Sequence, residues 1–332
     1  MTAGPYSRIA ILGGGAWGTA LAIAAIAAGR TTLLWAREDD VVTTITRDHE
    51  NKRFLPGIAL PKELSATGDL KHAVQADALL ITAPAQVLGE FVRTLAPLIV
   101  PGMPVVICAK GIEKNTGRLL HEIVAEALPD AACAILSGPS FAREVALGRP
   151  TAVTIAAEEG IAARLQASLS APFFRPYASD DVTGVALGGA AKNVYAIACG
   201  VVEGMGLGEN ARAALLARSF AELARLGEAL GARTETLMGL SGLGDLVLTA
   251  TSKSSRNFSF GVELGQGKSV AELSRPGNPL AEGVDTAPAL VKRARQAGVE
   301  LPIAEAMADL ISGALPLGEA VTRLMSRRLK VE

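Results

Sequence analysis

A single lysine, Lys192, interrupts an almost entirely apolar stretch at residues 187–199, with the sequence LGGAAKNVYAIAC. A stretch that is apolar nearly all round predicts a buried helix. Because desolvation disfavours the charged form, a lysine buried there is expected to have a lowered pKa. Such a lysine suits general acid and base catalysis near neutral pH. The alternative is a structural lysine that forms a salt bridge or extends to the surface.

Two further polar segments follow in the second half of the chain. Asp245 closes the glycine-rich segment GLSGLGD at residues 239–245, where its plainest role is that of a helix N-cap. The segment TSKSSRNF, at residues 251–258, concentrates hydroxyl groups, Arg256 and Asn257. Such a cluster either binds a phosphate through charge-assisted hydrogen bonds or forms a solvated loop.

A third candidate site lies near the N-terminus, in the segment IAILGGGAWGTALAIAAIAAG at residues 9–29. The segment predicts a short strand, a turn with Gly13, Gly15 and Gly18, and an alanine-rich helix. In a dinucleotide-binding unit these glycines permit the tight turn, the approach of backbone N–H groups to a pyrophosphate, and close packing of helix on strand. The N-terminus of the helix adds unpaired donors and a positive dipole end.

The same segment carries no charge, so a membrane span or the core of a signal peptide is the alternative. Three consecutive glycines would interrupt a spanning helix, and alanine is too weakly apolar to make a good one. A second strand is also expected directly afterwards, at residues 31–35. This order favours the dinucleotide-binding unit.

Cofactor choice depends on the residues after that second strand. An acidic residue there binds a ribose 2′-hydroxyl, whereas an arginine accommodates a 2′-phosphate. Arg37 favours NADP and Glu38 keeps NAD open. A solvated turn before a helix at residues 40–47 is the structural alternative.

The elements that must position these groups alternate between strand and helix in the first half of the chain. Buried strands are expected at residues 78–84, 104–109, 133–136, 151–155 and 173–177, with a helix at 86–98. Continuous apolar strands between helices predict a parallel sheet covered on both faces, whose ligands lie at the carboxyl ends of the strands. Lys110, Ser140 and the turn at Pro84 follow such ends. From about residue 185 the apolar spacing becomes helical.

Length and composition agree with two domains, expected at residues 1–184 and 185–332. The 332 residues are 49% hydrophobic and 20% charged, as in ordinary soluble proteins. A net charge of −1 gives no signature of nucleic-acid or membrane binding, so local groups must hold any anionic ligand. The three cysteines lack metal-binding spacing, which predicts reduced thiols in a cytoplasmic protein. No cleavable leader is expected either, since the sequence has no other long apolar run.

The whole chain resembles the bacterial NAD(P)-dependent glycerol-3-phosphate dehydrogenases. The family's motifs occur in order as GGGAWGTALA, FLPG, AKGIE, LSGPSFA, AAKNVYAI, GLGDLVLT, SSRN and AEGVDTA. The resemblance implies reversible reduction of dihydroxyacetone phosphate to sn-glycerol 3-phosphate, a precursor of phospholipid backbones, with NADP or NAD and a slight preference for NADPH. It also implies a cytoplasmic homodimer with a doubly wound Rossmann-type α/β domain and an all-α domain like the C-terminal domain of 6-phosphogluconate dehydrogenase.

The resemblance also assigns roles to individual residues, and it implies no metal. Lys192 matches the family's acid and base, while Lys110 and Asp245 match residues that hold and polarise the substrate. The implied substrate-binding residues are Lys110, Gly138, Ser140, Lys192, Asn193, Asp245, Ser255, Arg256 and Asn257. The implied cofactor-binding residues are Gly13, Gly15, Ala16, Trp17, Gly18, Arg37, Lys110, Ala142, Arg256, Leu280 and Glu282.

Some positions depart from the family's pattern. Ala16 and Trp17 stand where many members have a hydroxyl-bearing pair, Ala109 replaces a frequent serine, and Lys253 adds a positive charge. Two alternative functions are a non-catalytic cofactor-binding regulator and a dehydrogenase of β-hydroxyacids. The combination of Lys192, Asp245 and Arg256 favours an enzyme, and SSRN favours a phosphate over a carboxylate substrate.

Overall fold

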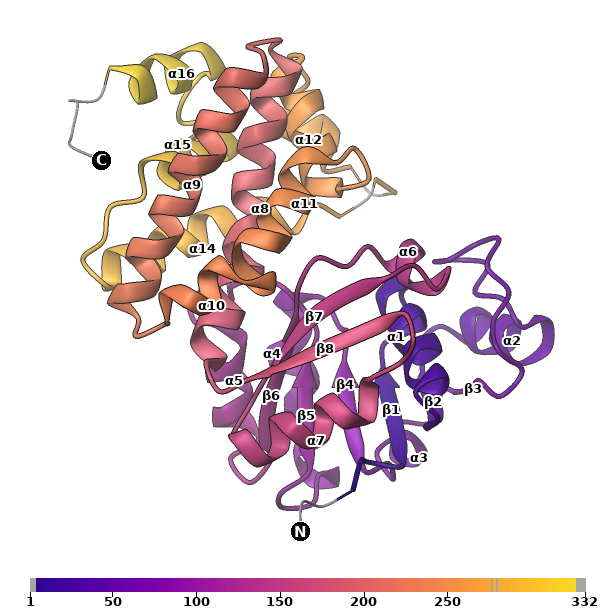
Figure 1. The fold of residues 1–332 in the computed structure, drawn as a ribbon. Coiled ribbons are helices and arrows are strands. Elements are labelled where there is room, and N and C mark those ends of the chain that lie inside the picture. Colours follow the sequence, from indigo (N-terminus) through magenta and orange to yellow (C-terminus); the bar gives the residue numbers. More distant parts are fainter. Residues whose placement is uncertain (1–3, 276, 279, 327–332) are drawn as a thin grey trace. The chain divides into compact units, whose positions relative to one another are not determined.

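The computed structural model describes residues 4–275, 277–278 and 280–326, which divide into two compact units (Figure 1). The first unit comprises the residues up to Lys110 and residues 120–186. The second comprises residues 111–119 and those from Leu187 onward. Residues 111–119 thus belong to the second unit, although elements of the first unit flank them in the sequence.

The first unit is built on one mostly parallel sheet. Its strands are β1 (Arg8–Leu12), β2 (Thr31–Trp35), β3 (Ser65–Thr67), β4 (Ala78–Ile81), β5 (Pro104–Ile107), β6 (Ala132–Ser137), β7 (Thr151–Ala156) and β8 (Phe174–Ser179). The eight strands are arranged in the order β3-β2-β1-β4-β5-β6-β7-β8. The predicted doubly wound sheet is therefore confirmed, with one difference: β6 and β7 pair antiparallel, whereas the other neighbours pair parallel.

Helices cover both faces of this sheet (Figure 1). They are α1 (Ala16–Ala27), α2 (Asp39–Asp48), α3 (Leu70–Ala73), α4 (Ala85–Leu95), α5 (Leu120–Ala127), α6 (Ala142–Ala146) and α7 (Glu159–Leu169). Successive strand residues face opposite cores. Ile9 and Ile11 share a core with residues of α1, α2 and α7, whereas Ala10 and Leu12 share one with residues of α4 and α5. Burial on both faces explains why the strands read as continuous apolar runs.

The carboxyl ends of the parallel strands gather the candidate residues of the first unit at one edge of the sheet. The glycine turn follows β1, Lys110 follows β5, and Gly138 follows β6. Strand β3 was not predicted, because its three residues, Ser-Ala-Thr, form no apolar run. It extends the sheet beyond β2.

The second unit is helical, as predicted. Its helices are α8 (Val182–Gly204), α9 (Glu209–Ala229), α10 (Thr234–Met238), α11 (Asp245–Thr251), α12 (Arg256–Gly265), α13 (Val270–Leu273), α14 (Glu282–Gln296), α15 (Pro302–Ser312) and α16 (Leu317–Met325). The first residues of α8 still belong to the first unit. Helix α8 is long and apolar enough to cross a membrane, but 94% of its most apolar window is buried inside the protein. It is the core helix of this unit.

Helices α8 and α12 are in direct backbone contact. A Cβ atom on Gly200 or Gly204 of α8 would collide with a carbonyl oxygen of α12, and one on Gly261 or Gly265 would collide with a carbonyl oxygen of α8. Only glycine permits such close approach. Because Gly200 faces Gly261 and Gly204 faces Gly265, the two helices run parallel, and the N-terminus of α12 lies beside the middle of α8.

A buried carboxylate, Glu222 of α9, ties three helices of this unit together. Its carboxylate accepts hydrogen bonds from the N–H groups of Ile303 (2.7 Å) and Ala304 (3.3 Å), two donors at the start of α15. Tyr195 of α8 donates its hydroxyl proton to the same carboxylate at 3.4 Å. Burial outweighs these hydrogen bonds and raises the pKa of Glu222 from 4.5 to about 7.

We expect Glu222→Gln to flatten the pH dependence of stability. Because the folded-state pKa exceeds the unfolded one, the native state binds an extra proton between pH 4.5 and about 7. This stabilisation, on the order of 3 kcal/mol, is complete below the unfolded pKa and is lost as the pH rises through the folded pKa. The thermal midpoint of the wild type should therefore fall more steeply than that of Glu222→Gln between about pH 5 and pH 8.

The matched control is Glu228→Gln, which changes an exposed carboxylate on the same helix. It should keep the wild-type profile. Parallel melting profiles for Glu222→Gln and the wild type would show that Glu222 does not titrate as described.

Candidate active site

Lys192 forms a closed cluster with two residues of α11. Its side chain is buried, and its ammonium group donates hydrogen bonds to Asp245 Oδ1 and, at 2.9 Å, to Thr249 Oγ1. Thr249 follows Asp245 by one helical turn and donates its hydroxyl proton to the same Asp245 oxygen at 3.3 Å. The buried cation is therefore both charge-paired and held in a fixed orientation.

The salt bridge that we gave as the structural alternative for Lys192 is present. It does not by itself explain why a charge is buried there, because the cost of desolvating two ions offsets most of their attraction. A buried, hydrogen-bonded ion pair is also how proteins orient a proton-transferring group. Asp245 is the first residue of α11 rather than its N-cap, which is Gly244, and its carboxylate is directed at Lys192.

Close packing of glycines places Asp245 beside α8. The chain reaches Asp245 through a π-helical turn at Leu240–Gly244. A Cβ on Gly242 would collide with the carbonyl oxygen of Leu237, and a Cβ on Gly188 of α8 would lie 2.7 Å from the carbonyl oxygen of Ser241. The glycine-rich segment is therefore a packing motif, which lets the chain approach α8 closely enough for Asp245 to reach Lys192.

Asn193 and Asn257 link α8, α12 and the start of α14. The Asn257 side chain donates from Nδ2 to Asn193 Oδ1 at 3.0 Å and accepts from the N–H of Gly283 at 2.9 Å. Asn257 is buried, so both ends of its amide are used within this unit. Glu282, the first residue of α14, is held next to this contact.

Arg256 begins α12 and is exposed. Ser255 is the N-cap of this helix, and its hydroxyl oxygen accepts a hydrogen bond from the N–H of Phe258 at 3.2 Å. Arg256 forms no salt bridge within the part of the chain that the structure describes. An exposed guanidinium at a helix N-terminus favours an anion there. Leu280, expected at the cofactor, lies exposed before α14.

In the first unit, the three glycines of the turn occupy the positions that a dinucleotide-binding turn requires. Gly13 has a φ of +138°, and a Cβ on Gly18 would collide with the Gly13 carbonyl oxygen. A Cβ on Gly15, the N-cap of α1, would meet nothing within 4 Å. The turn is thus tightly packed where it meets the sheet, and it leaves free space at the N-terminus of α1. This free space beside a helix N-terminus fits a pyrophosphate. Ala16 and Trp17 start the helix.

Arg37 and Glu38 follow β2 and form a salt bridge at 3.0 Å. The Arg37 side chain is 84% exposed, so most of its hydrogen-bonding capacity faces solvent. Glu38 is the N-cap residue of α2. Both groups expected to select the cofactor therefore lie beyond the end of β2, and the arginine is the more accessible of the two.

Lys110, Gly138 and Ser140 meet at the carboxyl ends of β5 and β6. The Gly138 carbonyl oxygen accepts hydrogen bonds from Lys110 Nζ at 2.8 Å and from the Ser140 hydroxyl at 3.0 Å. Gly138 has a φ of +149°, and a Cβ there would lie 2.8 Å from the backbone of Val153. Ala142 begins α6, which packs against α1. The structure thus brings Lys110 to Gly138 and Ser140, which lie in a segment distant from it in the sequence.

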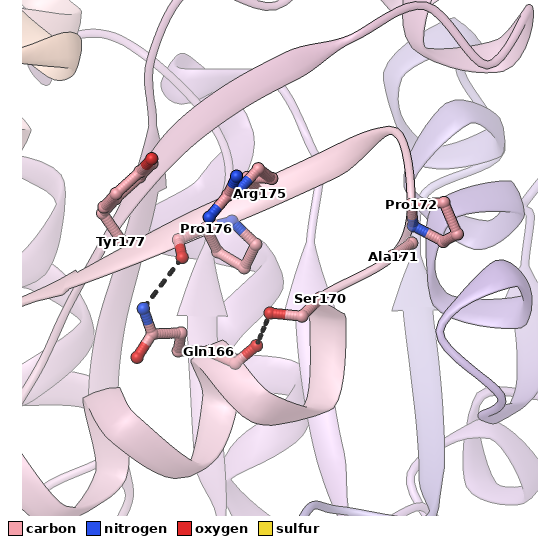
Figure 2. Close-up of a pocket in the computed structure, with 7 residues that line it drawn as sticks. All are labelled: Gln166, Ser170, Ala171, Pro172, Arg175, Pro176 and Tyr177. Atoms are coloured by element: carbon pink, nitrogen blue, oxygen red, sulfur yellow. Dashed lines mark hydrogen bonds between the residues drawn. The ribbon is translucent and has the colours of Figure 1, made fainter.

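A pocket of about 380 Å³ lies elsewhere on the first unit, between the end of α7 and β8 (Figure 2). Two of its lining side chains donate hydrogen bonds within the pocket wall: Gln166 to the Pro176 carbonyl oxygen at 3.0 Å, and Ser170 to that of Gln166 at 2.8 Å. No residue that the sequence analysis singled out lines it. The chemistry is therefore to be sought at the clusters described above.

Sequence reasoning did not single out Thr249 as part of the site. Its position was nevertheless readable, because a residue four places after Asp245 on a helix shares the same face. Its hydroxyl accepts from the ammonium group and donates to the carboxylate, which completes the cluster.

Two family models match the chain, one in each half. Residues 8–163 match the family model for the NAD-dependent glycerol-3-phosphate dehydrogenase N-terminus, and residues 181–322 match that for the C-terminus. The chain is 56% identical over 328 residues to a glycerol-3-phosphate dehydrogenase [NAD(P)+] of Parvibaculum lavamentivorans, covering 98% of each. It is 54% identical over 327 residues to that of Rhodospirillum rubrum, covering 98% of this chain and 94% of the relative.

Solved structures show the same likeness. The crystal structure of glycerol-3-phosphate dehydrogenase from Coxiella burnetii aligns with a TM-score of 0.91 at 38% identity, covering 97% of this chain and 99% of that one. The enzyme from Saccharomyces cerevisiae aligns with a TM-score of 0.83 at 27% identity, covering 96% and 99%. The expectation drawn from the motifs is thereby confirmed: this chain belongs to the NAD-dependent glycerol-3-phosphate dehydrogenase family.

Proposed function

We propose that Lys192 is the general acid and base in the reversible reduction of dihydroxyacetone phosphate to sn-glycerol 3-phosphate. The observation that supports this most strongly is the buried ammonium group held by Asp245 and Thr249. When bound, the dihydronicotinamide cofactor would be the source of the hydride for the carbonyl carbon. Lys192 donates a proton from Nζ to the carbonyl oxygen, which becomes the hydroxyl of the product. In the reverse direction the neutral amine removes that hydroxyl proton.

Electrostatic stabilisation of the developing oxyanion is the second part of the proposal. Negative charge grows on the carbonyl oxygen during reduction, and cations fixed in advance lower the barrier. Lys192 provides one such cation, with Asp245 holding it in orientation. We assign Lys110, together with Asp245, to holding and polarising the substrate, and Gly138 and Ser140 to lining its site; the hydrogen bonds at the Gly138 carbonyl support the grouping of Lys110 with Gly138 and Ser140.

For the substrate phosphate, the assigned ligands are Arg256 and the N-terminus of α12. The net charge of −1 provides no general attraction for a dianion, so local cations must do so. Ser255 also contributes through the cap of α12. Asn193 and Asn257 are assigned to the substrate site as well, and the hydrogen bonds of the Asn257 amide to Asn193 and to the N–H of Gly283 fix their positions.

Substitution of Lys192 tests its role. We expect Lys192→Ala to lower turnover by about 10²- to 10⁴-fold, as loss of a general acid does. Cofactor affinity, measured by quenching of protein fluorescence, should change by less than about threefold. Lys192→Arg keeps the positive charge beside Asp245 but cannot cycle its proton, so it should also be slow.

Lys268→Ala, which changes an exposed lysine of the same unit, serves as the control and should retain wild-type turnover. Thermal melting identifies variants that lose the fold. Near-normal turnover of a folded Lys192→Ala protein would show that Lys192 is not the general acid and base.

Substitution of Arg256 tests the phosphate site. We expect Arg256→Ala to raise KM for dihydroxyacetone phosphate by at least about tenfold, because it removes a hydrogen bond to a charged group. The kinetics with dihydroxyacetone, which lacks the phosphate, should stay within about twofold of the wild type. Arg295→Ala, an exposed arginine of α14, is the control. Equal losses with both substrates would argue against a phosphate contact.

For the cofactor we propose a preference for NADPH, set by Arg37. Its exposed guanidinium can bind a 2′-phosphate, whereas Glu38 is partly neutralised by pairing with it. Arg37→Gln should lower the ratio of kcat/KM for NADPH to that for NADH by about tenfold. Arg47→Gln, at an exposed arginine paired with Asp48, should leave this ratio unchanged. An unchanged ratio in Arg37→Gln would show that residues other than Arg37 set the cofactor preference.

We further propose that the chain acts in the cytoplasm as a homodimer and supplies glycerophospholipid synthesis, as the family resemblance implies. Burial and the absence of pairing of the three cysteines are compatible with a reducing compartment. Cys108, Cys133 and Cys199 are free thiols, and burial raises the pKa of Cys133 and Cys199 to about 12. Such thiols are protonated and unreactive at neutral pH.

A further inference from the structure

Asn51 lies beneath the glycine turn of the first unit and is fully buried. Its side-chain nitrogen donates a hydrogen bond to the Gly14 carbonyl oxygen and another to Thr19 Oγ1, both at 2.8 Å. Thr19, equally buried, donates its hydroxyl proton to the Gly15 carbonyl oxygen at 3.0 Å. Asn51 therefore reaches the carbonyl groups of two successive turn residues, one directly and one through Thr19.

These contacts determine which way the turn's N–H groups point. In a trans peptide the C=O bond and the following N–H bond are directed oppositely. Fixing the Gly14 carbonyl toward Asn51 directs the N–H of Gly15 away from it. The Gly15 carbonyl also accepts the backbone N–H of Thr19 at 3.0 Å, so helix α1 already directs the N–H of Ala16 out of its N-terminus, and the Thr19 hydroxyl reinforces this orientation. This is the open side of the turn, where a Cβ on Gly15 would meet nothing within 4 Å.

Asn51 is itself held by a loop with its own anchors. Its side-chain oxygen accepts from the N–H of Phe54 at 3.1 Å, and its carbonyl oxygen accepts from the N–H of Leu55 at 2.9 Å. Leu55, Ile58 and Leu60 are buried in the core that contains α1. The FLPG motif, which received no role above, therefore fixes the position of Asn51.

We propose that Asn51 and Thr19 are positioning residues for cofactor binding: they orient the peptide groups of the glycine turn toward the pyrophosphate. The proposal rests on the assignment of this turn to the dinucleotide, but not on the roles given to Lys192 or Arg256. Without the Asn51 donor the peptide group between Gly14 and Gly15 can rotate, and the N–H of Gly15 loses its preorganisation for the anion. The Gly15 carbonyl keeps its helical hydrogen bond from the N–H of Thr19, so the Thr19 hydroxyl acts mainly by holding Asn51 in place.

The experiment uses Thr19→Val and Asn51→Ala in the full-length protein. Thr19→Val is nearly isosteric and removes the hydroxyl that donates to Gly15 and accepts from Asn51, so it loosens Asn51 and carries the test if Asn51→Ala does not fold. We measure the inhibition constant of ADP, which contains the pyrophosphate, together with KM for NADPH, KM for dihydroxyacetone phosphate and kcat. ADP and NADPH should bind about tenfold more weakly, while kcat and KM for dihydroxyacetone phosphate at saturating NADPH stay within about twofold.

Two further measurements separate positioning from general stabilisation. Thr32→Val removes a buried hydroxyl of β2, which bonds to the Arg30 carbonyl at 3.2 Å, and should leave the ADP inhibition constant unchanged. The double variant Asn51→Ala/Thr19→Val should lose less ADP affinity than the two single losses multiplied, because both act on the same turn. Variants that melt earlier yet bind ADP normally would overturn the proposal. A wild-type protein that fails to bind ADP would instead overturn the assignment of the turn.

Discussion

An ammonium group buried in an apolar helix must be paired, and this requirement governs the construction of the second unit. Asp245 and Thr249 supply the partners for Lys192, and a π-helical turn rich in glycine brings them beside α8. The glycine contacts between α8 and α12 then place the N-terminus of α12 near the same stretch of α8. A buried ion pair contributes little net stability. The pair instead fixes the orientation of the Lys192 ammonium group inside this unit.

Close backbone approach is the device common to both units. At the glycine turn, Gly13 and Gly18 let α1 pack on the end of β1, and in the second unit glycines let α8 meet both α12 and the segment before Asp245. Each glycine sacrifices conformational entropy on folding. In return, packing holds the backbone in place. N–H donors and charged side chains on that backbone then need little rearrangement when an anion binds.

Much of the fold could be predicted from the sequence, because buried strands and helices leave clear apolar patterns. Strand β3 and the antiparallel pairing of β6 with β7 could not, since the first has no apolar run and the direction of a mostly buried strand leaves no mark in its sequence. Contacts such as Lys192 with Asp245, or Asn51 with Gly14, join distant segments and follow only from the tertiary structure. The roles of Lys110 and Arg256 came from the family motifs rather than from residue patterns.

The most direct test of this account is the decay of dihydronicotinamide absorbance when purified protein is mixed with dihydroxyacetone phosphate, with NADPH and NADH in parallel. The account predicts decay that requires the phosphate ester, that is far slower with dihydroxyacetone, and that is faster with NADPH than with NADH. Absence of turnover with either cofactor, in a protein shown to bind one of them, would contradict it and favour a non-catalytic cofactor-binding regulator.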